Sequence, residues 1–226
     1  MLVAIDTSTD TASLALVREG LVVAEITWRT DKNHSVQLLP NLEHLLKLVG
    51  TGAKSLTAVI VAKGPGSFNG LRVGISAAKG LAFSLNIPIV GVNSLEVTAY
   101  QYAETALPVC PVLNARRGEI ATALYQKQAS GWKQLRENYI TDVEKLCAEI
   151  TERTLFCGEY VQEISSRLLL LLPGKTVIAS PTTDLRRAAY LAELGVKRLA
   201  SGDTDNVATL QPVYLRLPAI TVAKHK

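Results

Sequence analysis

Apolar and β-branched residues gather in three short runs at the start of the chain. These runs cover residues 3–6, 11–17 and 21–27, and the triplet Arg18-Glu19-Gly20 separates the last two. Runs of this length that are bounded by turn residues are typical of strands. We therefore predict that the chain opens with a β-meander.

The pattern changes to a helical period after the third run. One side of a helix over residues 34–49 is occupied by four apolar residues, Leu38, Leu42, Leu45 and Val49. This spacing predicts an amphipathic helix. Pro40 lies inside the stretch, too late to be the first helical residue, so we expect a kink or a delayed start there.

A β-α-β pattern follows, which predicts parallel strands. Its elements are a strand at residues 58–62, a helix at 71–84 and a strand at 87–92. A short helix over residues 95–103 ends before Pro108, where a break is expected. We therefore place one domain at residues 1–107 and a smaller α/β domain at residues 108–226.

The second half of the chain repeats this theme. Strands are predicted at residues 109–113, 119–125, 154–157 and 177–179. Thr141 followed by Glu144 is typical of a capping box at the start of a helix. A last helix over residues 184–194 is expected to end at Gly195 in a left-handed conformation.

Residues 62–80 contain five glycines, Gly64, Gly66, Gly70, Gly74 and Gly80. The segment is neither a Walker A loop, because Leu71 stands where lysine is needed, nor a dinucleotide fingerprint, because Asn69 replaces the third glycine. A strand, a glycine turn and a helix N-terminus can still bind an anion. Close packing is the favoured alternative, because one ridge of the helix carries only small residues, Gly70, Gly74, Ala78 and Ala82.

We predict that this ridge packs against a neighbouring subunit, together with the apolar stripe of the helix at residues 34–49. The interface residues expected from these two patterns are Leu38, Leu42, Leu45, Val49, Gly70, Gly74 and Ala78. A two-fold arrangement of this face would be self-complementary and would serve a homodimer when the chain is alone. The opposing possibility is that the ridge faces only its own sheet.

Composition restricts the remaining classes of function. At 226 residues and 48% hydrophobic, the chain can bury a sizeable core, and no apolar stretch approaches membrane-spanning length. The opening residues lack the basic start of a secretory signal, and three widely spaced cysteines favour a reducing cytosol. We expect a cytoplasmic protein without a membrane partner.

The histidines do not form a metal site. His34 and His44 are ten residues apart, which corresponds to a rise of about 15 Å along a helix and side chains pointing roughly 80° apart. The third histidine, His225, lies near the end of the chain. We therefore predict no metal site and no metal-assisted peptidase activity.

The glycine segment carries a specific resemblance. The run Gly64-Pro-Gly-Ser-Phe-Asn-Gly-Leu-Arg-Val-Gly74 resembles the signature GPGSFTGLRVG of the TsaB (YeaZ) family, with Asn69 in place of threonine. Residues 4–9, 34–40, 115–119 and 212–216 match further family motifs in order, although Asn114 replaces the usual aspartate. The motif residues are Gly64, Pro65, Gly66, Ser67, Phe68, Gly70, Arg72, Arg116 and Glu119.

This resemblance implies a two-lobed α/β fold of the actin, sugar-kinase and Hsp70 type (ASKHA, ribonuclease H-like), with a reduced second lobe. It also implies a non-catalytic subunit that binds and activates TsaD in forming threonylcarbamoyladenosine at position 37 of ANN-decoding tRNAs. TsaD and the ATPase TsaE are the implied partners, and tRNA is reached through the complex. No catalytic residue is then expected in this chain.

The superfamily likeness also raises an alternative, a stand-alone ATP-dependent kinase or transferase. In active members, the aspartate that ends the first strand positions Mg²⁺, which corresponds to Asp6 here. Ser8 stands where many of those enzymes have glycine, so we expect at most a remnant phosphate site at Asp6 and Ser8. ATP or ADP at an interface with TsaD stays open, while no cofactor is expected for the chain alone.

A third hypothesis is a nucleic-acid-binding module. Residues 1–107 hold 8 Lys/Arg and 8 Asp/Glu, whereas residues 108–226 hold 16 and 12, so the whole excess of +4 lies in the second half. An anionic neighbour is one explanation, and ordinary solvated charge is the other. The candidate basic residues are Arg116, Arg117, Arg186, Arg187, Lys197 and Arg198.

Overall fold

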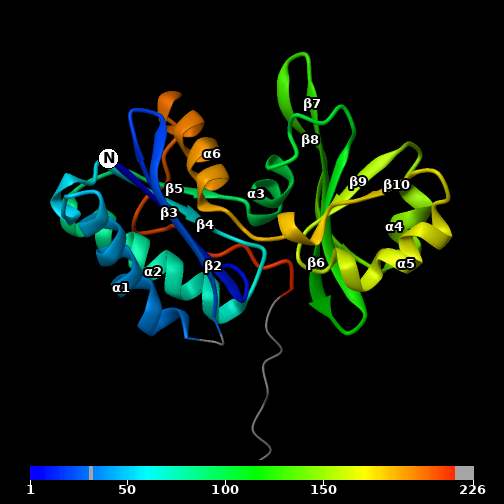
Figure 1. The fold of residues 1–226 in the computed structure, drawn as a ribbon, viewed down its shortest axis with the longest axis horizontal. Coiled ribbons are helices and arrows are strands. Elements are labelled where there is room, and N and C mark those ends of the chain that lie inside the picture. The colour runs from blue at the N-terminus through cyan, green and yellow to red at the C-terminus, as the bar shows by residue number, and fades with distance from the viewer. Residues whose placement is uncertain (31–32, 217–226) are drawn as a thin grey trace, which may run out of the picture.

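The computed structural model describes residues 1–30 and 33–216, which form two five-stranded sheets with helices around them (Figure 1). The first sheet has the order β3-β2-β1-β4-β5 and the second the order β10-β9-β6-β7-β8. In each sheet an antiparallel meander is extended by parallel strands. The predicted α/β fold class is confirmed.

The first half of the chain builds the first sheet and the helices beside it. Its strands are β1 (Leu2–Asp6), β2 (Thr11–Arg18), β3 (Leu21–Arg29), β4 (Ala58–Ala62) and β5 (Ile89–Val92). Its helices are α1 (His34–Leu48), the short η1 (Ala53–Ser55), α2 (Phe68–Leu85) and α3 (Ser94–Tyr100). The predicted opening meander and the parallel β1-β4-β5 unit are both present.

The second half builds the second sheet and returns to the first. Its strands are β6 (Val109–Arg116), β7 (Glu119–Gln128), β8 (Gly131–Thr141), β9 (Thr154–Cys157) and β10 (Thr176–Ile178). Its helices are α4 (Val143–Glu149), α5 (Val161–Leu171), the short η2 (Pro181–Thr183) and α6 (Ala188–Ala200). We call the first sheet with α1, α2 and α6 the first lobe, and the second sheet with α4 and α5 the second lobe.

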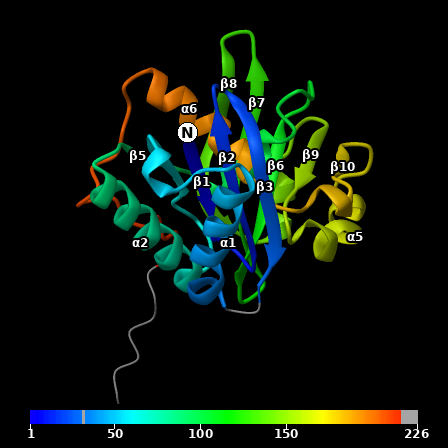
Figure 2. The ribbon, with the colours of Figure 1, turned by 60° about the vertical axis from the view of Figure 1, so that its left-hand side comes forward.

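Alternation along the strands assigns each face of the first sheet. Val3 and Ile5 of β1 pack with α1 and α2 on the outer face, whereas Ala4 packs with α6 on the inner face. Figure 2 shows α1 and α2 covering the outer face. Because successive strand residues point to opposite faces, a strand of uniformly apolar residues is buried between two helical layers.

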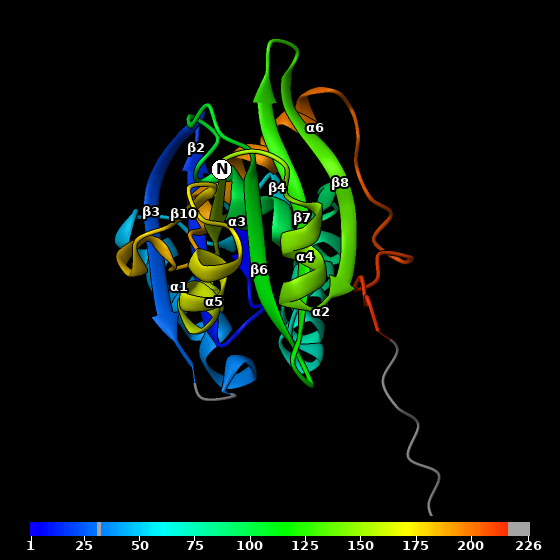
Figure 3. The same ribbon diagram turned by 90° about the vertical axis from the view of Figure 1, so that its right-hand side faces the viewer.

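The second sheet is layered in the same way. Cys110 and Val112 of β6 pack against α4 and α5, which cover the outer face in Figure 3. Leu95 and Ala99 of α3 pack on the other face of this sheet. Val97 of α3 belongs to the inner core of the first lobe, so α3 joins the two lobes.

Helix α6 departs from the expected domain division. Leu191 and Ala192 pack against the first sheet, although they follow the whole second sheet in the chain. Residues 108–226 therefore do not stay within the second lobe. The prediction that Gly195 ends this helix is wrong, because α6 continues to Ala200 and Gly195 lies inside it against Ile60.

Other helix boundaries also differ from the prediction. α2 begins at Phe68 rather than Leu71, capped by Ser67, and α1 runs from His34 through Pro40 without a delayed start. The cap of α4 is Asp142, whose side chain accepts a hydrogen bond from the backbone N–H of Lys145 at 2.8 Å, and Thr141 ends β8 instead. Local patterns located these helices and the first residue of α1, but they did not give the first residues of α2 and α4.

Besides the short helices η1 and η2, two longer elements, β8 and α5, were not predicted. β8 is an edge strand with many polar, partly exposed residues, so it lacks the apolar run of a buried strand. α5 contains the leucine run, in which Leu168 is buried and Leu170 is exposed. Both elements can be recognised only from their neighbours in the fold, which are β7 beside β8 and the core of the second lobe beneath α5.

The position of Gly195 leads to a stability prediction. A Cβ atom there would lie within 3.0 Å of the Ile60 side chain, so Gly195→Ala should destabilise the protein by about 1–3 kcal/mol through overpacking. This loss opposes the helix-propensity gain of up to about 1 kcal/mol. Urea unfolding would measure it, with Gly80→Ala as control, because Gly80 has open space around it and should gain stability. Equal stabilisation by both variants would contradict the assigned packing of α6.

Candidate functional site

The glycine segment lies against the turn between β1 and β2. The backbone N–H of Ser67 donates to the carbonyl oxygen of Ser8 at 2.6 Å, and the Thr7 hydroxyl donates to the carbonyl oxygen of Gly70 at 2.8 Å. A Cβ atom at Gly66 or Gly70 would come within 3.0 Å of a carbonyl oxygen of this turn. Glycine is required there because two backbones are in direct contact.

The small-residue ridge of α2 therefore faces its own sheet. A Cβ atom at Gly74 would collide with the Thr7 hydroxyl, and Ala78 is fully buried in the core of the first lobe. The prediction that this ridge meets a neighbouring subunit is wrong. The apolar stripe of α1 is also internal. Leu38, Leu42 and Leu45 belong to the same core, and Val49 packs against it.

Other apolar residues of the same two helices are exposed. Val36 and Leu39 of α1 are 67% and 53% exposed, and Phe83 of α2 is 82% exposed. Gly80 lies in the middle of α2, and apart from neighbouring residues and the nearby helix backbone no atom of the described chain lies within 4 Å of a Cβ built there. We call these four residues the outer apolar face.

The motif residues before and within α2 contact both α3 and the C-terminal segment. The Gly64 N–H donates to the Ser94 hydroxyl at 3.0 Å, which fixes the segment to α3. Phe68 lies 5.1 Å from Tyr214 between ring centroids, and the guanidinium of Arg72 sits 4.3 Å above the Phe68 ring. The C-terminal segment is thereby held against the start of α2.

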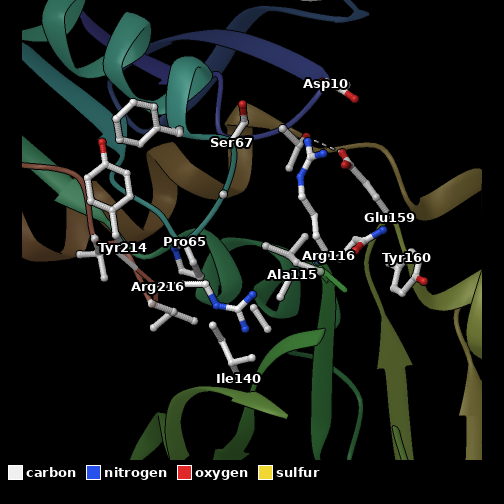
Figure 4. A pocket seen from close by; sticks show the side chains of 18 of the residues that line it. Asp10, Pro65, Ser67, Ala115, Arg116, Ile140, Glu159, Tyr160, Tyr214 and Arg216 are labelled. Carbon is white, nitrogen blue, oxygen red and sulfur yellow. Dashed lines mark hydrogen bonds between the residues drawn. The ribbon is translucent and has the colours of Figure 1, made fainter. Parts of the chain in front are cut away.

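An open cavity of about 650 Å³ lies between the lobes, beside the start of α2 (Figure 4). The β1-β2 turn, residues 65–69, the β6-β7 turn and residues 213–216 contribute to its wall. Arg116 and Arg216 enter it from the last two of these segments, and Glu159 adds a carboxylate. Its wall thus combines basic, acidic and aromatic groups from both lobes.

The β6-β7 turn has an unusual backbone. Arg116 and Arg117 have φ values of 66° and 57°, in a region that residues other than glycine seldom adopt. The Asn114 side-chain oxygen accepts a hydrogen bond from the Arg116 N–H at 2.7 Å and so supports this conformation. Glu119 forms an ion pair with Arg216, which ties the turn to the C-terminal segment.

Asp6 and Ser8 are buried beside this cavity rather than lining it. Asp6 is 1% exposed and Ser8 0%, and the Ser8 hydroxyl and N–H donate to Oδ1 of Asp6 at 2.5 and 2.8 Å. Nη1 of Arg186 lies 3.4 Å from the other carboxylate oxygen. The expectation of a remnant phosphate site at Asp6 and Ser8 is therefore not supported. Both side chains already interact with groups inside the protein.

The predicted basic residues do not form one patch. Arg186 is buried, and Arg187 lies 2.6 Å from the carboxylate of Glu25. Lys197 pairs with a glutamate on its own helix, and Arg198 pairs with two aspartates. Only Arg116 of the predicted set lines the cavity. The hypothesis of a nucleic-acid-binding module thus loses the continuous charged surface that it needs.

The histidines serve local structure. His34 is buried, and its Nε2 lies 2.8 Å from the carbonyl oxygen of Thr9, whereas His44 is exposed. His225 lies outside the described residues. Within residues 1–30 and 33–216, no group of three His, Cys, Asp or Glu side chains is placed to hold a metal ion. No helix in this part of the chain is long and apolar enough to cross a membrane.

Sequence reasoning missed several residues of this region. Glu159 and Tyr214 were not singled out, although both line the cavity, and the pairing of Arg186 with Asp6 was not foreseen. Residues 212–216 carried a motif signal that could have indicated Tyr214. Nothing in the sequence indicated the other contacts, because they join residues up to 180 positions apart.

Solved structures define the class of this protein. The fold matches YeaZ from Pseudomonas aeruginosa with a TM-score of 0.82 and 26% identity, covering 95% of this chain and 99% of that one. It also matches an inorganic polyphosphate/ATP-glucomannokinase from Arthrobacter with a TM-score of 0.50 and 12% identity, over 87% and 98% of the chains. The protein therefore has the two-lobed actin and sugar-kinase type of fold.

Sequence relatives narrow this class to a family. The model of TsaD, tRNA N6-adenosine threonylcarbamoyltransferase, matches residues 22–215. The tRNA threonylcarbamoyladenosine biosynthesis protein TsaB of Bacillus subtilis is 35% identical over 219 residues, covering 96% of this chain and 94% of that protein. Its Escherichia coli counterpart is 30% identical, over 95% and 94%. This chain belongs to the TsaB (YeaZ) family.

The role of Asn114 can be tested directly. Asn114→Ala removes the acceptor for the Arg116 N–H and should cost about 1 kcal/mol of unfolding free energy. Asn114→Asp keeps a side-chain oxygen at this position and should stay within about 0.5 kcal/mol of the parent protein. Chemical denaturation of both variants measures the difference. Equal losses would show that the hydrogen bond does not support the turn.

Proposed function

We propose that this chain is a non-catalytic, activating subunit in the formation of threonylcarbamoyladenosine at position 37 of ANN-decoding tRNAs. It acts by binding a TsaD-type transferase and holding it in an active arrangement. Membership of the TsaB family supports the pathway, and the match to the TsaD family model supports a partner with a related lobe. The exposed side of α1 and α2 carries the proposal for how the partner binds.

The outer apolar face has the properties of a helix-packing surface. Large apolar side chains that are 53–82% exposed have no cover within the described chain, and burying each would contribute about 1.5–3 kcal/mol. The exposed Gly80 lowers helix stability by up to about 1 kcal/mol without any internal contact in return. A helix of a partner could approach α2 closely at this position. Together these features favour a helix-to-helix interface.

The interior favours a supporting role over independent catalysis. Asp6, the residue that would hold Mg²⁺ in the stand-alone kinase or transferase alternative, is buried against Ser8 and Arg186. The cavity between the lobes favours this alternative, because it could admit a small molecule. Catalysis would then need a metal or acid–base group on its wall.

We further propose how the other components join. The outer apolar face serves a homodimer in the absence of the transferase, since related lobes would compete for one surface. A TsaE-type ATPase and tRNA enter through the complex, and ATP or ADP binds at the interface with the transferase rather than to this chain alone. This arrangement belongs in the cytoplasm, where tRNA is modified.

Substitutions on the outer apolar face should separate binding from folding. Phe83→Asp and Gly80→Leu should each weaken binding to the transferase at least tenfold. Phe83→Asp places a charge in the interface, and Gly80→Leu places a side chain in the space that a partner helix would occupy. Neither variant should lose folding stability, since both positions are open in the isolated chain. Isothermal titration calorimetry and thermal unfolding measure the two effects.

Leu170→Asp is the matched control for these variants. Leu170 is 78% exposed on α5, in the other lobe, so its replacement should leave binding unchanged. The proposed interface fails if Phe83→Asp and Gly80→Leu bind normally, or if Leu170→Asp weakens binding as much as they do.

Reconstitution tests the proposed function itself. Purified transferase, ATPase, tRNA and precursors should form threonylcarbamoyladenosine at a high rate only when this chain is added. Alone, the chain should show negligible ATP hydrolysis, because Asp6 is not available to a metal. The modified nucleoside is quantified by mass spectrometry, and phosphate release reports hydrolysis. Hydrolysis by the isolated chain that disappears in Asp6→Ala would support the kinase alternative instead.

A further inference from the structure

An ion cluster, formed by the buried Asp6 and Arg186 and the partly exposed Glu159, lies where the two lobes meet. Nη1 of Arg186 is 3.4 Å from Oδ2 of Asp6, and Nε is 3.6 Å from Oε1 of Glu159. The side chains of Arg186 and Asp6 are 2% and 1% exposed. Asp6 ends β1 of the first lobe and Glu159 precedes α5 of the second, so one guanidinium faces carboxylates from both lobes.

Two hydrogen bonds to uncharged groups complete this junction. Nη1 of Arg186 also donates to the carbonyl oxygen of Ser94 at 3.3 Å, at the start of α3. The Thr9 hydroxyl donates to the same Glu159 oxygen at 2.7 Å across the lobes. Asp6, in turn, is held on its other oxygen by Ser8. Each member of the cluster is therefore fixed in position by a neighbouring segment.

The hydrogen bonds of this cluster leave some of its buried polar atoms without a partner. Six buried side-chain polar atoms of the described residues lack a hydrogen-bond partner, and four of them lie on Ser13, Asp184 and Arg186. Two are Nε and Nη2 of Arg186 itself, and Ser13 is the strand neighbour of Asp6. A buried charge persists in such surroundings only if an opposite charge compensates it.

The residues here do not fit the Mg²⁺-nucleotide that the fold family implies at the end of β1. A hard cation needs open oxygen ligands, but one oxygen of Asp6 accepts two hydrogen bonds from Ser8 and the other faces the guanidinium. We propose that Arg186 is a built-in cation, which replaces a bound metal as the counter-charge of Asp6 and Glu159. It joins the two lobes in one arrangement without any ligand.

This role explains why the link into α6 crosses between the lobes. Arg186 is positioned two residues before α6, and its backbone carbonyl accepts a hydrogen bond from the Thr27 hydroxyl of β3 at 3.2 Å. The return of the chain to the first sheet thus delivers the positive charge to the junction. The guanidinium is part of the chain and therefore cannot dissociate. The arrangement of the two lobes then does not depend on the supply of nucleotide or metal.

Removing this cation should create a site for a free one. Arg186→Ala removes the cation between Asp6 and Glu159, and the unbalanced buried charge of Asp6 should lower the Tm by about 10 °C. Millimolar Ca²⁺ or Mg²⁺ should restore several degrees of this loss, because oxygen ligands bind these ions and binding stabilises the folded state. The parent protein should not respond to either ion. Differential scanning calorimetry of the isolated chain measures all three.

Two further variants keep the test decisive. The added substitution Asp6→Asn in Arg186→Ala should abolish the response to Ca²⁺ and Mg²⁺, since the site then lacks its buried carboxylate. The double variant Asp6→Asn/Arg186→Met removes both charges with similar shapes, so it should fold and ignore the ions. If Arg186→Ala folds only in the presence of an ion, that result also supports the proposal.

The proposal is overturned by any of three results. These are an unchanged Tm of Arg186→Ala, a loss of stability that neither ion reduces, and an ion response that survives the added substitution Asp6→Asn. These readouts use the isolated chain without transferase or tRNA. Failure here is therefore distinguishable from failure of the proposed function, which reconstitution tests separately.

Discussion

The direct contact between the backbone of α2 and the β1-β2 turn determines which surfaces of the first lobe remain free. Gly66, Gly70 and Gly74 leave no side chain between the helix and Thr7 and Ser8. With one side of α2 fixed against the turn, the opposite side must face outward. Gly80 and Phe83 are therefore exposed because of where the other glycines are placed, and not because of any property of their own.

The same contact organises the junction between the lobes. The turn that receives α2 also carries Ser8, which holds Asp6 by two hydrogen bonds. Asp6 then faces Arg186, which reaches Glu159 on the second lobe. Packing adds to this, because Trp132 of β8 contacts the inner cores of both lobes and stacks on Tyr125. A rigid link between the lobes would present the outer apolar face in a fixed orientation.

Much of the fold could be predicted because the relevant interactions are local. The opening meander, β4 and the amphipathic α1 follow from periodicities that a window of a few residues reveals. Boundaries were less accurate, as at Ser67 and Asp142, since a cap depends on one hydrogen bond at the helix end. The motif residues at 64–74 identified the family.

The sequence by itself determined the strands, most helices, the family and the need for close packing along the Gly70–Gly74 ridge. It could not decide what packs against that ridge, because a helix without side chains on one face fits a sheet or a partner helix equally well. The tertiary structure assigned it to the β1-β2 turn. It alone also brought Arg186 to Asp6, because electrostatic pairing acts through space and leaves no periodic signal in residues 180 positions apart.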